Sequence, residues 1–132
     1  MGFLNSLKPL FSGSDRSELW KVPQSESEIE SVFSKDGGLH LIYKHSYACG
    51  VCRFSLMRIE KKLSNISEHA IPWFIDVRNQ RKLSNKIAEL SGVRHESPQL
   101  LLLLNGDVYW SGSHSEVDAA PILESLKELK LI

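Results

Sequence analysis

The sequence predicts an α/β fold of three layers, with a mixed central sheet of about five strands flanked by helices. Short apolar runs alternate with stretches whose apolar residues recur every three or four positions, which is typical of strands connected by helices. Near the C-terminal end, Asn105-Gly106 is a strong hairpin signal between two apolar runs, and a hairpin makes the sheet mixed. The length of 132 residues suits a single domain with an adequate core.

Charge and hydropathy favour a globular protein without nucleic-acid or membrane partners. The chain carries 16 basic and 16 acidic residues, so no net charge attracts nucleic acid or an anionic membrane. No apolar run approaches the roughly 20 residues that span a bilayer, and the opening residues lack the features of a secretory signal. We therefore expect a monomeric cytoplasmic protein.

The N-terminal part predicts a lead-in, a short strand and a helix. Residues 1–17 are rich in Ser and Gly, and we expect them to form a flexible segment before a domain at 18–132. The alternation at 20–22 predicts an edge strand. A helix follows, with Ser25 as its N-cap and the glycines at 37–38 as its stop.

The next strand leads directly into a helix that begins at the cysteines. Residues 39–45, LHLIYKH, are apolar enough to predict a central strand covered on both faces. Cys52, Leu56, Ile59 and Leu63 then follow at intervals of 4, 3 and 4 residues. This spacing places all four on the buried face of one helix.

The remaining elements repeat this alternation. Further strands are expected at 71–77, 99–104 and 107–110. Further helices are expected around the stripes Leu83, Ile87, Leu90 and Ile122, Leu126, Leu129, the first ending at Gly92. Because helices connect the strands, we expect parallel pairing everywhere except in the closing hairpin.

Cys49 and Cys52 are the only cysteines in the chain. Cys49 is expected at the mouth of the helix with an exposed sulfur, and Cys52 one turn later with a shielded one. A closed zinc site needs four Cys or His ligands, so a single cysteine pair leads us to expect no metal. A disulfide across so short a loop removes little chain entropy, which disfavours a structural role. A helix N-terminus stabilises a thiolate, the reactive form, and therefore favours a redox pair.

Pro98 directly precedes the apolar strand at 99–104. Proline at the first position of a strand deletes no hydrogen bond of the ladder. The Ser97-Pro98 bond is either a cis peptide or a trans peptide that ends the loop, and the sequence leaves both open.

These features resemble the thioredoxin superfamily over about residues 19–130: a strand, CGVC and a helix, then SPQ before LLLL, then NGD. More narrowly, Lys44-His45-Ser46, the run VRHESPQ at 93–99 and Ser113-His114-Ser115 resemble the monothiol bacilliredoxins, the YtxJ-like family. The resemblance implies a thioredoxin-like fold in a bacterial protein that removes bacillithiol, a low-molecular-weight thiol, from mixed disulfides on client proteins. It also implies Cys49 as the nucleophile and Pro98 as a cis proline that faces it. Bacillithiol is expected as a co-substrate, with no bound cofactor.

The chain departs from the family pattern at two places. Members often carry serine at the second position of the motif, where Cys52 stands, so we expect Cys52 to resolve the mixed disulfide and protein disulfides to be substrates too. Thioredoxins carry a buried carboxylate on the preceding strand, where this chain has Tyr43 and Lys44. His45 is therefore a candidate for proton handling; the alternative is a hydrogen-bonded histidine at the strand end.

Four residues are candidates for substrate binding besides His45. The backbone of Ser97 is expected to pair with an extended substrate. Lys44, Arg53 and Arg94 are candidates for binding the carboxylates of bacillithiol, although each is also explained as a solvated surface charge.

A different class of function is a redox sensor or scaffold, in which the state of the cysteine pair controls binding to a partner. An exposed Trp20 or Trp110 would then serve as an interface. A peroxidase is not supported, because no loop rich in Pro and Thr precedes Cys49.

Overall fold

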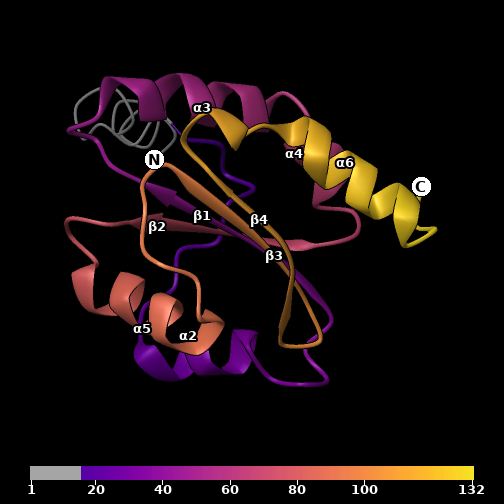
Figure 1. The fold of residues 1–132 in the computed structure, drawn as a ribbon, viewed down its shortest axis with the longest axis horizontal. Coiled ribbons are helices and arrows are strands. Elements are labelled where there is room, and N and C mark those ends of the chain that lie inside the picture. Colours follow the sequence, from indigo (N-terminus) through magenta and orange to yellow (C-terminus); the bar gives the residue numbers. More distant parts are fainter. Residues whose placement is uncertain (1–15) are drawn as a thin grey trace, which may run out of the picture.

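The computed structural model describes residues 16–132 and shows the three predicted layers, with a mixed sheet between two layers of helices (Figure 1). The strands are β1 (Leu39–His45), β2 (Ile71–Asp76), β3 (Gln99–Leu104) and β4 (Asp107–Ser113). The helices are α2 (Glu26–Val32), α3 (Gly50–Glu60), α4 (Leu63–Ile66), α5 (Arg81–Ser91) and α6 (Ala119–Glu128), with a 3-10 turn η1 (His114–Glu116). Helices α3, α4 and α6 cover one face of the sheet, and α2 and α5 cover the other (Figure 1).

The predicted lead-in at 1–17 lies outside the described residues except for Arg16 and Ser17. The Arg16 guanidinium lies 5.1 Å from the ring centre of Phe74, and the Ser17 N–H donates to a Glu60 carboxylate oxygen at 2.6 Å. Within residues 16–132, no helix combines the length and the apolar character needed to cross a membrane.

The sheet contains four strands, in the order β2-β1-β3-β4, rather than about five. The stretch expected as an edge strand is reduced to an isolated parallel bridge between Lys21 and Trp73. There, the Lys21 N–H donates to the Pro72 carbonyl and the Phe74 N–H donates to the Lys21 carbonyl, both at 2.8 Å. Pro23 follows two residues later and has no N–H to extend the ladder. The pairing therefore ends after one bridge.

The direction of β3 differs from the prediction. β1 pairs with β2 in parallel, as expected, but β3 runs antiparallel to β1. Residues 92–98 connect α5 to β3. Seven extended residues span up to ~3.5 Å each, so this connection is long enough to run back along the whole of α5, an 11-residue helix about 16 Å long. This connection returns to the end of the sheet where α3 begins (Figure 1). β3 therefore starts there, with Gln99 paired to Lys44.

Two helices end elsewhere than expected. Ser25 caps α2 as predicted, accepting from the Glu28 N–H at 3.2 Å. However, α2 ends at Val32, because Phe33 and Ser34 donate to carbonyls three residues back and tighten the chain into a turn. Leu63 is buried with the predicted stripe but belongs to α4, since the helix breaks after Glu60. Leu90 is exposed, so the buried face of α5 is narrower than predicted.

Alternate residues of β1 supply two apolar cores, one on each face of the sheet. Leu41 and Tyr43 pack with Leu56 and Ile59 of α3, whereas Ile42 packs with residues of α2 and α5. All seven residues of β1 are buried, which confirms the prediction of a central strand covered on both faces. The end of β1 is therefore held firmly before the chain reaches the cysteines.

The hairpin between β3 and β4 turns at Asn105 and Gly106, as predicted. Their φ angles are 50° and 87°, and a two-residue turn of this kind needs positive φ at both positions. A Cβ atom at position 106 would lie 2.5 Å from the carbonyl oxygen of Phe33. Glycine is thus required there both for its conformation and for the close approach of the segment that follows α2.

We expect Gly106→Ala to destabilise the fold more than Gly38→Ala. Gly38 also has a positive φ, 82°, but its added Cβ would meet no atom within 4 Å. Gly38→Ala should therefore cost about 1–2 kcal/mol of unfolding free energy for the left-handed conformation alone. Gly106→Ala should cost about 1–3 kcal/mol more for the steric conflict. Urea unfolding measures both, and equal losses would show that the contact with Phe33 is unimportant.

Candidate active site at the start of helix α3

Three residues, 46 to 48, connect the end of β1 to Cys49, which precedes α3. Cys49 is the N-cap of α3, with extended dihedral angles of −109° and 115°. Both cysteines are free; Cys49 is partly exposed and Cys52 is 0% exposed. The two sulfurs therefore differ in access as the spacing predicted.

The first turn of α3 gives the two thiols different acidities. A hydrogen bond from the Cys52 thiol lowers the pKa of Cys49 most, and the backbone N–H groups of Cys52 and Val51 lower it further. Burial raises the pKa of Cys52 to about 11, although the backbone N–H of Ser46 opposes this shift. Cys49 is thus the group that ionises first, and Cys52 remains a thiol.

A buried pair, Tyr43 and His45, lies on the face of β1 that packs against α3. The Tyr43 hydroxyl donates to the Cys52 carbonyl oxygen at 3.0 Å, because a carbonyl only accepts. The hydroxyl has a single hydrogen, so in its 2.9 Å contact with His45 Nδ1 the ring nitrogen donates. A neutral His45 therefore carries its hydrogen on Nδ1 and its lone pair on Nε2. Burial raises the pKa of Tyr43, which keeps the hydroxyl protonated.

Exposed apolar side chains flank Cys49 in the sequence. Tyr47 precedes it and is 43% exposed, while Val51 and Phe54 follow it on α3 and are 59% and 62% exposed. The ring centres of Tyr47 and His45 lie 4.5 Å apart, so this surface is in contact with the buried pair of Tyr43 and His45. A surface of this kind suits contact with a protein rather than with a highly charged small molecule.

The Ser97-Pro98 peptide bond is cis, which settles the choice that the sequence left open. Pro98 is buried, and Gln99, the next residue, pairs with Lys44 near the end of β1. The proline and Cys49 therefore lie at the same end of β1.

Lys44 is expected to bind a carboxylate of bacillithiol, which requires an exposed ammonium group, but the structure buries it. Its side chain is 0% exposed and faces α5, where Nζ donates to the Ser84 carbonyl at 3.0 Å and to His95 Nδ1 at 3.2 Å. Burial lowers the pKa of Lys44 to about 8. The prediction for Lys44 is therefore wrong, because every position of a strand covered on both faces is buried.

Arg53 and Arg94 do lie on the surface, but the structure does not combine them with Lys44 into one cationic site. Arg53 is exposed on α3, next to Cys52. The Arg94 side chain is 92% exposed and lies 3.8 Å from a carboxylate oxygen of Glu96. Ser97 is half-buried beside Pro98.

Histidines do not join the cysteines in a metal-binding arrangement. His40 and His45 are five positions apart, an odd number, and therefore face opposite sides of β1. His40 accepts from Trp73 Nε1 at 3.0 Å on the face of α2 and α5, whereas His45 contacts Tyr43 on the face of α3. Among residues 16–132, no three His, Cys, Asp or Glu side chains are grouped as metal ligands.

The two tryptophans that are candidates for a partner interface differ in exposure. Trp20 is 5% exposed, stacks on Tyr43 with ring centres 5.7 Å apart and donates to Glu60 at 2.8 Å. Trp110 is half-buried and packs against the core. Trp20 is therefore not available as an interface, whereas Trp110 presents part of its surface.

We expect the acidity of Cys49 to depend on a hydrogen-bond donor at position 52. Cys52→Ala removes the donor and should raise the pKa of Cys49, whereas Cys52→Ser keeps a donor and should hold it lower. The rate of iodoacetamide alkylation measured against pH reports this pKa in both variants. Equal pKa values would mean that the α3 backbone alone sets the acidity.

Comparison with known proteins identifies the fold and the family. The family model of monothiol bacilliredoxin BrxC matches residues 22–122. A candidate oxidoreductase with a thioredoxin fold has a TM-score of 0.71 and 23% identity, covering 81% of this chain and 93% of that one. Thioredoxin O2 from Arabidopsis thaliana, in its oxidised state, has a TM-score of 0.63 and 25% identity, covering 83% and 93%. Thioredoxin from Malassezia sympodialis has a TM-score of 0.64 and 18% identity, covering 83% and 89%. The fold is thus thioredoxin-like, and the chain belongs to the monothiol bacilliredoxin family.

Proposed function

We propose that this protein is a cytoplasmic thiol-disulfide oxidoreductase that reduces mixed disulfides between bacillithiol and client proteins, and protein disulfides. One observation carries the proposal: a partly exposed Cys49 with lowered pKa, and a buried Cys52 thiol one turn behind it. Membership of the bacilliredoxin family supports a thioredoxin-like redox activity. Bacillithiol acts as a co-substrate, and no resident cofactor is needed.

The first step is attack by the Cys49 thiolate on one sulfur of the substrate disulfide. The substrate S–S bond breaks, a bond forms between Cys49 and the attacked sulfur, and the other sulfur leaves as a thiolate that takes a proton from solvent. The N–H groups of Cys52 and Val51 stabilise the attacking thiolate. The partial exposure of Cys49 lets the substrate approach.

The second step is attack by Cys52 on the Cys49 sulfur. Cys52 first loses its proton, the mixed disulfide breaks, and the bound thiol leaves as Cys49 and Cys52 join. Tyr43 stays protonated and is not the base, whereas a neutral His45 has a lone pair on Nε2. We propose His45, whose ring packs beside Tyr43, as the acceptor of the Cys52 proton. Two molecules of bacillithiol then reduce the internal disulfide and leave as bacillithiol disulfide.

Client recognition combines backbone pairing with apolar contact. The backbone of Ser97, two residues before β3 begins, pairs with an extended client segment and adds affinity that does not depend on the sequence of the client. The exposed side chains of Tyr47, Val51 and Phe54 contact the client beside this segment. Arg53 and Arg94 remain available for the carboxylates of bacillithiol, since both are exposed.

Cys52→Ser should trap the mixed disulfide, because serine cannot release the bound thiol. Incubation with a bacillithiol-modified protein should yield a Cys49 adduct visible by intact mass spectrometry, and Cys49→Ser should yield none. With excess bacillithiol, the unmodified protein should reduce many equivalents of substrate. A sensor would change state once, and that result, or the absence of an adduct, would contradict the proposed function.

His45→Gln should slow the second step and spare the first. Loss of a general base typically costs a factor of 10² or more, so release of the bound thiol should slow by about that factor near pH 7. Adduct formation in the Cys52→Ser background should be unchanged, because it does not require deprotonation of Cys52. Acid quenching and mass spectrometry separate the two steps. A pH profile of release that matches that of the unmodified protein would exclude His45 as the base.

A further inference from the structure

Lys44 is a buried lysine without a carboxylate partner. Its side chain is 0% exposed, and its two hydrogen-bond partners, the Ser84 carbonyl and His95 Nδ1, are neutral groups. Within residues 16–132, no carboxylate lies at ion-pair distance from its ammonium group, and burial lowers its pKa to about 8. Burying a lysine is costly, and an apolar side chain of the same length would avoid that cost. Stability of the fold therefore does not explain why lysine occupies this position.

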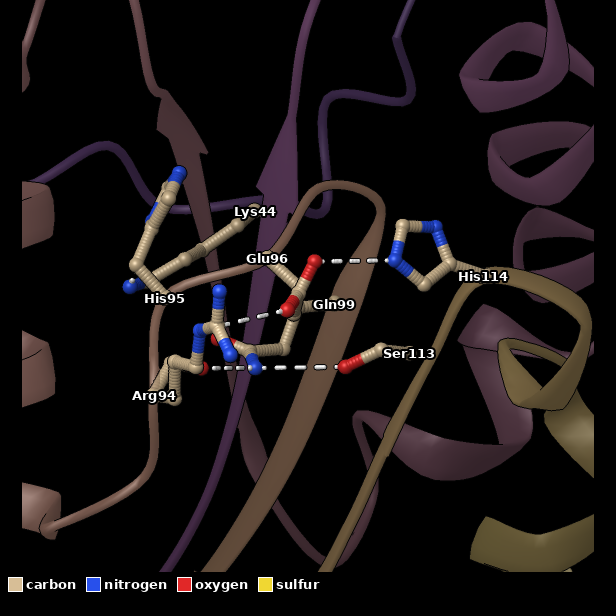
Figure 2. A network of polar contacts seen from close by, with 7 residues as sticks. All are labelled: Lys44, Arg94, His95, Glu96, Gln99, Ser113 and His114. Atoms are coloured by element: carbon tan, nitrogen blue, oxygen red, sulfur yellow. Dashed lines mark hydrogen bonds and ion pairs between the residues drawn. The ribbon is translucent and has the colours of Figure 1, made fainter.

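The contacts of Lys44 reach the segment that precedes Pro98. Figure 2 shows Lys44 approaching His95, with Gln99 bound to the neighbouring Arg94 and Glu96 reaching His114. Gln99 Nε2 donates to the Arg94 carbonyl at 2.9 Å and to the Ser113 hydroxyl at 3.2 Å, and Glu96 contacts His114 Nε2 at 2.9 Å. Each of the residues 94, 95 and 96 is thus held by a different element: β3, β1 and the turn after β4, respectively. Ser97 comes immediately after them.

The contact between Lys44 and His95 exists only while His95 is neutral. An ammonium group only donates, so His95 Nδ1 accepts and its hydrogen lies on Nε2. The Ser84 hydroxyl, 3.2 Å from the same nitrogen, also donates to it. Protonation of His95 would place an N–H against the ammonium group and break the contact.

Groups from each neighbouring element affect the protonation of His95. Burial lowers its pKa most, followed by Lys44 on β1 and Arg81 on α5, while Glu96 in its own segment opposes them. Ser84 on α5 is uncharged. His95 is therefore neutral near pH 7 and gains a proton only in acid, at a pH below its usual value.

We propose that Lys44 is a positioning residue: through neutral His95 it fixes the segment before Pro98, and so holds the Ser97 backbone in place for an extended substrate. This inference rests on the proposed function, in which Ser97 pairs with the client. Its consequence is selective. Reduction of a disulfide within a peptide depends on Lys44, whereas reduction of a small disulfide without a peptide backbone does not. In acid, both reactions slow because the Cys49 thiolate is lost. The peptide reaction should slow further, because protonated His95 no longer binds Lys44.

Two substrates test the inference: a peptide carrying a bacillithiol mixed disulfide, and bis(2-hydroxyethyl) disulfide, which has no peptide backbone. Lys44→Met and His95→Leu should lower kcat/KM for the peptide about tenfold, mainly through KM, as for loss of one hydrogen bond to a charged group. Both should stay within about twofold of the unmodified protein on the small disulfide. His95→Gln keeps an acceptor and should preserve the peptide reaction. Lys82→Met, at an exposed lysine of α5, is the matched control.

The pH dependence supplies a second, independent readout. The ratio of the two kcat/KM values cancels the titration of Cys49, since both substrates need its thiolate. This ratio should fall in acid for the unmodified protein and stay constant for His95→Gln, which does not titrate.

Equal losses on both substrates, or no loss on either, would overturn the role of Lys44. Failure of the unmodified protein to turn over either disulfide would instead contradict the proposed function. If Lys44→Met does not fold, as judged by circular dichroism, the comparison of His95→Leu with His95→Gln decides the question alone, because His95 is only partly buried.

Discussion

The junction between β1 and α3 is the constraint on which the rest of the site depends. β1 is paired on both sides and buried along its whole length, so the position of its last residue, His45, is fixed. The chain reaches Cys49 four residues later, at the N-cap of α3, where the backbone N–H groups of Val51 and Cys52 help to lower the pKa of its thiol. Cys52 follows three positions later in the first turn of α3, on the face of the helix that packs against the core. One acidified, accessible sulfur and one shielded thiol follow from a buried strand that runs directly into a helix.

The same end of β1 carries polar groups on both faces of the sheet. On the side of α3, the Tyr43 hydroxyl donates to the Cys52 carbonyl and is in contact with His45. On the side of α5, Lys44 is bonded to His95, in the segment that leads to Pro98. Buried polar networks of this kind rigidify a site when their members are paired, at a cost in stability. We infer that one network handles the proton of the resolving thiol and the other holds the substrate-binding segment.

Local patterns predicted most of the fold. The buried stripe from Cys52 to Ile59 and the turn at Asn105-Gly106 each depend on neighbouring residues, and both appear in the structure. The direction of β3 depends on the path of residues 92–98 over the sheet, which periodicity does not encode.

Within the site, the access of the two sulfurs was predictable from helical spacing, whereas the hydrogen bonds around them were not. The charge of Lys44 predicts a surface ligand, but its position decides otherwise, because a strand covered on both faces leaves no exposed place for it. The tautomer of His45 follows from the Tyr43 bond to the Cys52 carbonyl, a contact between two elements that only the fold brings together. Sequence spacing thus locates the cysteines, and tertiary packing determines how they are supported.

The dithiol mechanism requires that Cys52 outcompetes an external thiol for the sulfur of Cys49. The most direct measurement is equilibration of the protein in bacillithiol redox buffers of increasing oxidation, followed by acid quenching and intact mass spectrometry. The dithiol mechanism predicts that the oxidised protein is mainly the internal Cys49–Cys52 disulfide, lighter by two hydrogens, with the bacillithiol adduct a minor species. An adduct on Cys49 that dominates at every ratio, with Cys52 still a free thiol, would contradict it and show a single-thiol enzyme.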